Sequence, residues 1–150
     1  MQLLTLLAFL VAAAPAMPLM AQGLDEEGAI ETIIDAPVAI EEKTVDEEEA
    51  RIAAAIDKSS DNAAEIRKRF AIEQVEIVFV PDLSGETSAL DQKIKDNDEA
   101  IKEVRTAIES SAIFFHAIDS QQVLLRDVIA VEFGDNDGIT IFAAGKNPQN

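Results

Sequence analysis

The sequence predicts a small α+β domain of element order α-β-α-(α)-β-β, in which a three-stranded mixed sheet carries its helices on one face. Three observations predict this fold. Two long stretches have apolar residues at helical spacing, and a β-branched run at 75–80 lies between them. Two more β-prone runs follow near the end of the chain, separated by five turn residues. We expect residues 44–145 to form this one domain.

The first 21 residues contain no charged side chain, and they predict a secretory signal peptide. An apolar run over residues 3–14 ends at two prolines, and Ala16 and Ala21 offer two positions for cleavage. A retained membrane anchor is the alternative, but a spanning helix needs roughly 20 apolar residues without such a break. We therefore expect an exported protein, periplasmic or secreted, without stable membrane insertion. The alanine-rich leader before an acidic sequence also has the general style of bacterial envelope proteins.

The acidity is concentrated in one flank of the chain. Residues 22–49 hold 11 acidic side chains against Lys43 alone, so they contribute −10 to the net charge of −17. Within this flank, residues 22–43 have scattered apolar side chains without a sustained period, which predicts an acidic, flexible linker. At the other end, residues 146–150 are expected to be a disordered tail.

Charge and composition exclude several classes of function. Nucleic-acid binding requires a basic stripe for phosphate contacts, and an anionic membrane surface would repel so acidic a chain. The chain has no cysteine, which removes disulfides, thiol chemistry and cysteine-ligated zinc. The partners that remain are an unidentified protein or a cationic molecule, and solubility is the default reason for the acidity.

The first helix is expected over about residues 46–70. Residues 44–47 (TVDE) match the capping box, in which a Thr hydroxyl and a Glu carboxylate satisfy reciprocal backbone donors. The middle is weak, because Ser59 occupies the apolar seam and two polar residues follow it. One helix with a weak middle is preferred over two halves broken at Ser59-Ser60-Asp61. The apolar seam consists of Ile52, Ile56, Ala63, Ile66 and Phe70.

A buried strand is expected at 75–80, because this β-branched and aromatic run is closed by a proline. Residues 84–87 then supply helix-start chemistry, and an amphipathic helix follows over about 87–110. Asn97 is a polar residue in its seam, where it can fix register or oligomeric state, but packing inside the domain is preferred over a coiled coil. A short apolar helix is expected over 113–118. The seam consists of Leu90, Ile94, Asn97, Ile101, Val104 and Ile108.

The last two strands are expected at 128–133 and 139–143, joined as an antiparallel hairpin. The long connection from the strand at 75–80 to the strand at 128–133 leaves room for a helical crossover, which would make these two strands parallel. The strand at 139–143 has no charged residue, so it is the expected free edge of the sheet. A homodimer, through that edge or through the long helices, is slightly preferred over a monomer.

Residues 135–138 (DNDG) alternate oxygen ligands before a glycine, as a calcium loop does. The fit fails in both registers. One register puts Phe133 at the first ligand position, and the other puts Ile139 at a ligand position and Thr140 where glycine is required. A hairpin turn explains the same residues without a metal.

No nucleophile or general base stands out. His116 is the only histidine, it lies in an apolar stretch, and no cysteine exists to join it in a metal site. The chain has no G-x-S-x-G, G-x-G-x-x-G or P-loop sequence. The serines that could otherwise attract attention are interpreted as residues at helix ends or breaks, and they are Ser59, Ser60, Ser84, Ser110 and Ser111.

The sequence therefore predicts no catalytic, cofactor-binding or metal-binding residue and no cofactor. We expect a non-enzymatic binding or protein-interaction module of the bacterial envelope. The alternative is a carboxylate-based hydrolase assisted by a divalent metal. Against a specific glycosidase site, 29 acidic residues make chance pairs of carboxylates inevitable, and the chain has no Trp or Tyr to line a sugar cleft.

Overall fold

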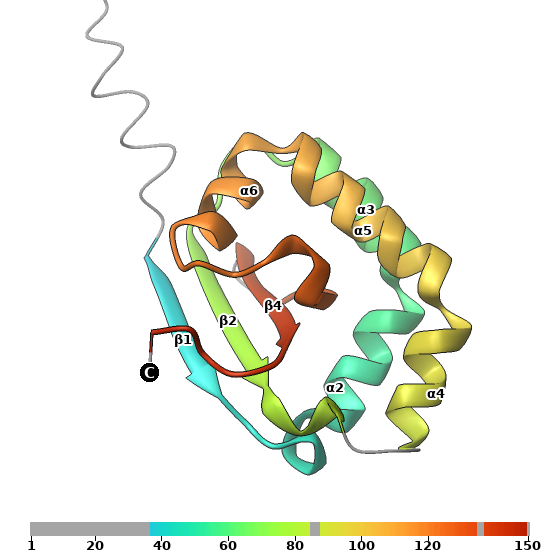
Figure 1. Cartoon of the computed structure of the whole chain (residues 1–150). Coiled ribbons are helices and arrows are strands. Elements are labelled where there is room, and N and C mark those ends of the chain that lie inside the picture. The colour runs from blue at the N-terminus through green and yellow to red at the C-terminus, as the bar shows by residue number, and fades with distance from the viewer. Residues whose placement is uncertain (1–36, 85–87, 135–136, 150) are drawn as a thin grey trace, which may run out of the picture.

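A computed structural model describes residues 37–84, 88–134 and 137–149 (Figure 1). The predicted signal peptide and most of the predicted linker lie outside the described residues. Within the described part, no helix is long and apolar enough to cross a membrane.

Four strands form one mixed sheet in the order β1-β2-β4-β3. β1 and β2 are parallel, β2 and β4 are parallel, and β3 is antiparallel to β4. The α+β class is confirmed, but the expected number of strands was too small by one. The strands are β1 (Val38–Glu42), β2 (Gln74–Val80), β3 (Val128–Phe133) and β4 (Gly138–Ala144).

The additional strand, β1, lies in the stretch that the sequence predicted as linker. Its five residues, VAIEE, end in two acids and are partly exposed, so they carry little local strand signal. What orders them is pairing with β2, in which Val38 lies beside Val75 and Ile40 beside Ile77. A strand defined by its neighbour cannot be recognised from its own five residues.

The hairpin of β3 and β4 is confirmed as antiparallel, and the N–H of Gly134 donates to the carbonyl of Gly138 at its mouth (2.9 Å). Asp137 takes the left-handed conformation of the turn, with φ of 57°. The expectation that the strands at 75–80 and 128–133 are parallel was wrong. The long connection carries the chain past the neighbouring position to the far edge of the sheet, and β4 then returns between β3 and β2. β4 is therefore an interior strand and not a free edge.

Each predicted long helix is two helices. The first breaks at Lys58, and the second breaks at Asn97, whose backbone N–H and side-chain amide both donate to the Lys93 carbonyl (3.1 and 2.8 Å). Asn97 thus closes one helix and precedes the next, and it does not sit in a continuous seam. The helices are α2 (Val45–Asp57), α3 (Ser59–Lys68), α4 (Ala89–Asp96), α5 (Asp98–Ser110) and α6 (Ala112–Asp119).

The helix starts differ in detail from expectation. α4 is capped by Ser88, whose hydroxyl accepts from the N–H of Asp91 (3.0 Å) while the Asp91 carboxylate accepts from the N–H of Ser88 (3.4 Å). This pair forms a capping box, whereas the sequence placed the residues that start this helix at 84–87. Phe70, expected in the helical seam, follows the end of α3 and is 86% exposed.

Helices cover both faces of the sheet, not one. Successive side chains of β2 point to opposite faces of the sheet. Ile77 packs into the hydrophobic core on one face, which we call the first core, and Val78 packs into the second core on the other face. The first core is completed by α3, the second half of α5 and α6, through Ala63, Ile66, Val104, Ile108, Phe114 and Ile118. The second core is completed by α2, α4 and the first half of α5, through Ile52, Ile56, Leu90 and Ile101.

The two bent helix pairs pass from one face to the other around the β3 edge (Figure 1). There, Asn62 of α3 donates its side-chain amide to the Val131 carbonyl (2.6 Å), and Arg105 of α5 donates to the Val128 carbonyl (2.8 Å). Burial lowers the pKa of Arg105, against the opposing effect of Asp98 and Asp127. Two helices thus cover the edge strand, and their side chains satisfy its backbone carbonyls.

Ser59 provides a stability test. It is 1% exposed, and its hydroxyl has no hydrogen-bond partner among the described residues. Ser59→Ala should raise the free energy of unfolding by about 1 kcal/mol or more, because it removes an unsatisfied buried hydroxyl and improves helix propensity. Urea denaturation measures this difference.

The matched control is Ser60→Ala, one residue along in the same helix at an exposed position. It should gain only the propensity difference, about 0.5 kcal/mol or less. Equal gains at both positions would mean that the Ser59 hydroxyl carries no desolvation cost.

Candidate functional site

Polar side chains form one row across the sheet, on the face that α2 partly covers. Glu76 of β2 lies beside Thr140 of β4, and Thr140 lies beside Glu132 of β3. Their neighbours in each strand face the opposite core, so these three point to the face of the second core. The row lies toward the amino ends of the parallel strands β2 and β4, beside the side chains of α2.

Two cations hold this row together. Arg51 of α2 donates to Glu132 (2.6 Å), to Glu48 (2.9 Å) and to Thr140 (3.3 Å). The Thr140 hydroxyl in turn donates to Glu76 (3.0 Å). We call the set Glu41, Lys43, Glu48, Arg51, Glu76, Glu132 and Thr140 the polar cluster.

Lys43 closes the polar cluster on the side of β1. Its ammonium group lies 2.8 Å from Glu41, 3.2 Å from Glu48 and 3.9 Å from Glu76. The hydrogen bond to Glu41 raises the pKa of Lys43, burial opposes this, and Glu48 adds to it. For Arg51, burial opposes the charge, but the hydrogen bonds that it donates to Glu132 and the nearby carboxylates raise its pKa. Both cations are therefore held charged by the carboxylates around them.

These contacts decide what the polar cluster can do. Glu48 is only 5% exposed, and it is paired with both Lys43 and Arg51. Cations of the chain itself hold these carboxylates, and a divalent metal would have to displace them. In the described part of the chain, no group of three His, Cys, Asp or Glu side chains is arranged to hold a metal ion. The polar cluster is an internally satisfied network, and it offers no nucleophile or open ligand set.

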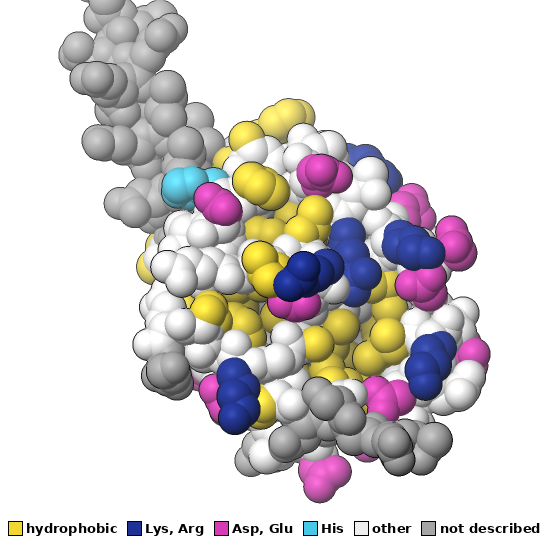
Figure 2. All heavy atoms as spheres, in the orientation of Figure 1, with side chains coloured by type: hydrophobic (Ala, Val, Ile, Leu, Met, Phe, Trp, Pro, Cys, Tyr) yellow, Lys and Arg dark blue, Asp and Glu magenta, His cyan; other side chains and the backbone are white. Residues whose placement is uncertain are grey.

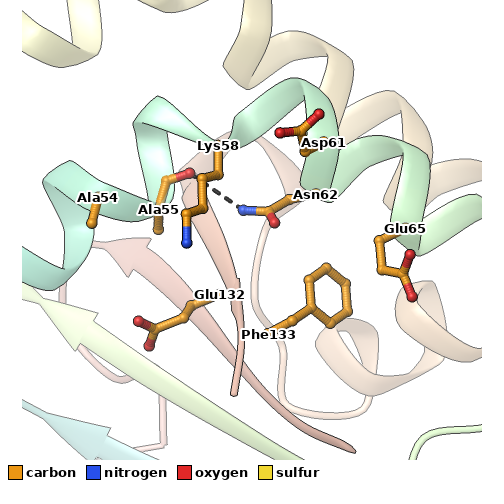
Figure 3. A pocket seen from close by; sticks show the side chains of 8 residues that line it. All are labelled: Ala54, Ala55, Lys58, Asp61, Asn62, Glu65, Glu132 and Phe133. Carbon is orange, nitrogen blue, oxygen red and sulfur yellow. Dashed lines mark hydrogen bonds between the residues drawn. The ribbon is translucent and has the colours of Figure 1, made fainter. Parts of the chain in front are cut away.

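Two shallow hollows flank Glu132. One, of about 310 Å³, lies over the polar row, and Arg51, Glu76 and Thr140 line it. The other, of about 340 Å³, lies between the α2–α3 bend and the end of β3, with Lys58 reaching in from the bend opposite Glu132 (Figure 3). Asn62 borders the second hollow, but its amide already donates to Val131 and, at 3.4 Å, to Ala55. Glu65, also at this hollow, is paired with Arg69, whereas the Lys58 and Asp61 side chains have no hydrogen bond or ion pair in the described part of the chain.

The residues that the sequence singled out do not come together. His116 is exposed on α6 and lines none of these hollows (Figure 2 shows the histidine side chain in cyan). Ser110 and Ser111 line a third hollow, of about 280 Å³, with Arg67 and Phe70. Asp137 pairs with Arg69 (2.8 Å), and the rest of the rejected calcium loop, 135–136, lies outside the described residues.

At the outer edge of β1, backbone groups have no partner among the residues that the structure describes. The carbonyl of Pro37 accepts from Val75 (3.2 Å), and the N–H of Lys43 donates to Phe79 (3.0 Å). Because backbone groups alternate in direction along a strand, those of Val38, Ile40 and Glu42 point away from β2. β1 is the last strand of the sheet on this side and lies on the border of the molecule away from α3 and α5 (Figure 1).

The two ends of the sheet therefore differ. At β3, side chains of two helices bind the edge carbonyls. At β1, no helix or side chain in the described ranges does so, and the half-buried Val38 and Ile40 side chains stay at the rim of the first core. Comparison of the chain with protein-family models, with curated proteins and with solved structures gave no match. The candidate site rests on geometry alone, and it is the β1 edge.

The polar cluster predicts a pH dependence of stability. The pKa of Lys43 is raised above its ordinary value of 10.5, so its contribution is complete below that pH and is lost as the pH rises through the folded-state pKa. Lys43→Met should therefore be less stable than the wild type below pH 10.5, and the difference should shrink above it. Thermal unfolding at pH 7 to 12 measures the difference, using the folded fraction at each pH.

Lys146→Met is the matched control, because Lys146 is an exposed lysine after β4. It should follow the wild type at every pH. A Lys43→Met difference that stays constant through the alkaline range would show that the lost methylene packing, rather than the charge, stabilises the fold.

Proposed function

We propose that this chain is an exported, non-enzymatic binding module that takes up a strand of another polypeptide at the outer edge of β1. The observation that carries the proposal is the difference between the two sheet edges. The β3 edge is covered by α3 and α5, whereas the outward backbone groups of β1 have no partner in the described part of the chain.

Strand addition suits the chemistry of β1. Main-chain hydrogen bonds to an open edge supply affinity, and alternate side chains supply specificity. On one face, Val38 and Ile40 extend the apolar surface of the first core to the rim. On the other face, Glu41 is held by Lys43, so the edge presents a fixed charge pattern to the incoming strand.

Export of the protein is a separate part of the proposal, and it rests on the uncharged first 21 residues, which we interpret as a signal peptide. Fractionation and intact mass of the native protein should give a processed chain in the periplasm or medium, shortened after Ala16 or Ala21. A full-length chain in the cytosol would contradict export, and so would one that stays with membranes through alkaline washing.

A photo-reactive amino acid at position 40 tests the binding edge in native cells. It should yield covalent adducts with a polypeptide, because a strand paired with β1 lies within hydrogen-bonding distance of Ile40. The control places the same amino acid at Phe115, which is 42% exposed on α6. Adducts no more frequent at position 40 than at position 115 would overturn the proposed function.

A further inference from the structure

We infer that the strand taken up by β1 is the β1 of a second copy of this chain, running antiparallel across a two-fold axis at Ile40. The inference rests on the proposed function, since it names the occupant of the same edge. It also replaces the dimer expected through the strand at 139–143, because that strand is now the interior of the sheet.

The direction of the backbone groups of β1 determines which residues of the two copies can form hydrogen-bonded pairs: those with even numbers. Val38, Ile40 and Glu42 carry the outward N–H and C=O groups, so only these residues can exchange hydrogen bonds with a neighbouring strand. An antiparallel pair centred on Ile40 places it opposite Ile40 of the second copy, and Val38 opposite Glu42. Every outward backbone group between Val38 and Glu42 then has a partner.

Charge selects the same register. Pairing centred on Ile40 puts no acid directly opposite another acid. A shift of the centre to Glu41 would put two Glu41 side chains opposite each other, and a shift to Glu42 would do the same for Glu42. Shifts in the other direction leave Glu42 without a partner inside β1. The register with complete pairing is therefore also the one without repulsion across the strands.

Pairing of two copies also removes the last open edges. The product is one continuous sheet with the two β1 strands at its centre and a β3 strand at each end. Both ends are covered by α3 and α5 with the Asn62 and Arg105 hydrogen bonds in place. A two-fold pair of this kind is closed, so it stops at a dimer and cannot extend into a fibre.

The first test is the mass of the natively purified protein by sedimentation equilibrium. We expect a dimer at tens of micromolar protein, strengthened as NaCl rises from 50 to 500 mM, because each copy carries a net charge of −17. Ile40→Lys places two like charges at the axis and should weaken the dimer at least tenfold. Ala39→Lys is the matched control, because position 39 would face Glu41 of the second copy and the dimer should persist.

The second test uses the absence of cysteine from the chain. Ile40→Cys should form an interchain disulfide on mild oxidation, since residues of a hydrogen-bonded antiparallel pair have Cα atoms about 5.5 Å apart, within disulfide range. Thr106→Cys, exposed on α5, should stay reduced under the same conditions. This disulfide test of the dimer can be interpreted even if the Ile40→Lys variant fails to fold.

The outcomes separate the two proposals. A wild-type monomer at both salt concentrations, with no disulfide from Ile40→Cys, overturns the dimer. If photo-crosslinking at position 40 then captures a different polypeptide, the proposed function stands with another occupant. If neither a second copy nor another chain is captured there, both proposals fail.

Discussion

The exposed backbone of β3 is the constraint on which the rest of the structure depends. As the last strand of the sheet it carries outward carbonyls, and those of Val128 and Val131 are bound by Arg105 and Asn62. To supply these groups, α3 and α5 must lie across the sheet edge. Each helix pair therefore bends, at Lys58 and at Asn97, so that its first half packs on one face and its second half on the other. Because α3 and α5 lie against β3, no helix of the described part of the chain covers the outer edge of β1.

Local signals predicted the strands at 75–80, 128–133 and 139–143 and the hairpin, because β-branched runs and turn residues act over a few positions. The first helix break was visible only as the less favoured alternative at Ser59-Ser60-Asp61, and the second was not expected, since apolar residues keep helical spacing on both sides of Lys58 and Asn97. What distinguishes two bent helices from one straight helix is the sheet edge they must pass around, and that edge is formed by residues far away in the sequence. β1 was missed for a related reason, because its pairing with β2 is a tertiary contact.

The polar cluster could not be found from spacing either. Thr140 and Glu76 are bonded although 64 positions separate them, and Arg51 reaches Glu132 across 81 positions. The available clue was the isolated polar position in three otherwise apolar strands, at Glu76, Glu132 and Thr140. If the register of β2 with β4 or of β3 with β4 shifted by one residue, one of these polar side chains would point into the first core. The ion pairs and hydrogen bonds of the polar cluster therefore join side chains that only this register brings together.

The same acids that make β1 a weak strand signal give its edge specificity. Small proteins commonly protect an open edge with charge, and here the charges stand only at one end, at Glu41, Glu42 and Lys43. The other end, through Val38 and Ile40, is apolar. An edge charged throughout would reject every strand, and an edge without charge would accept any register. Charge at one end disfavours partners that align acid with acid, which is the basis of the single antiparallel alignment that we propose. If β1 takes up a strand as we propose, this distribution of charge would allow the edge to bind one partner alignment and to reject indiscriminate aggregation.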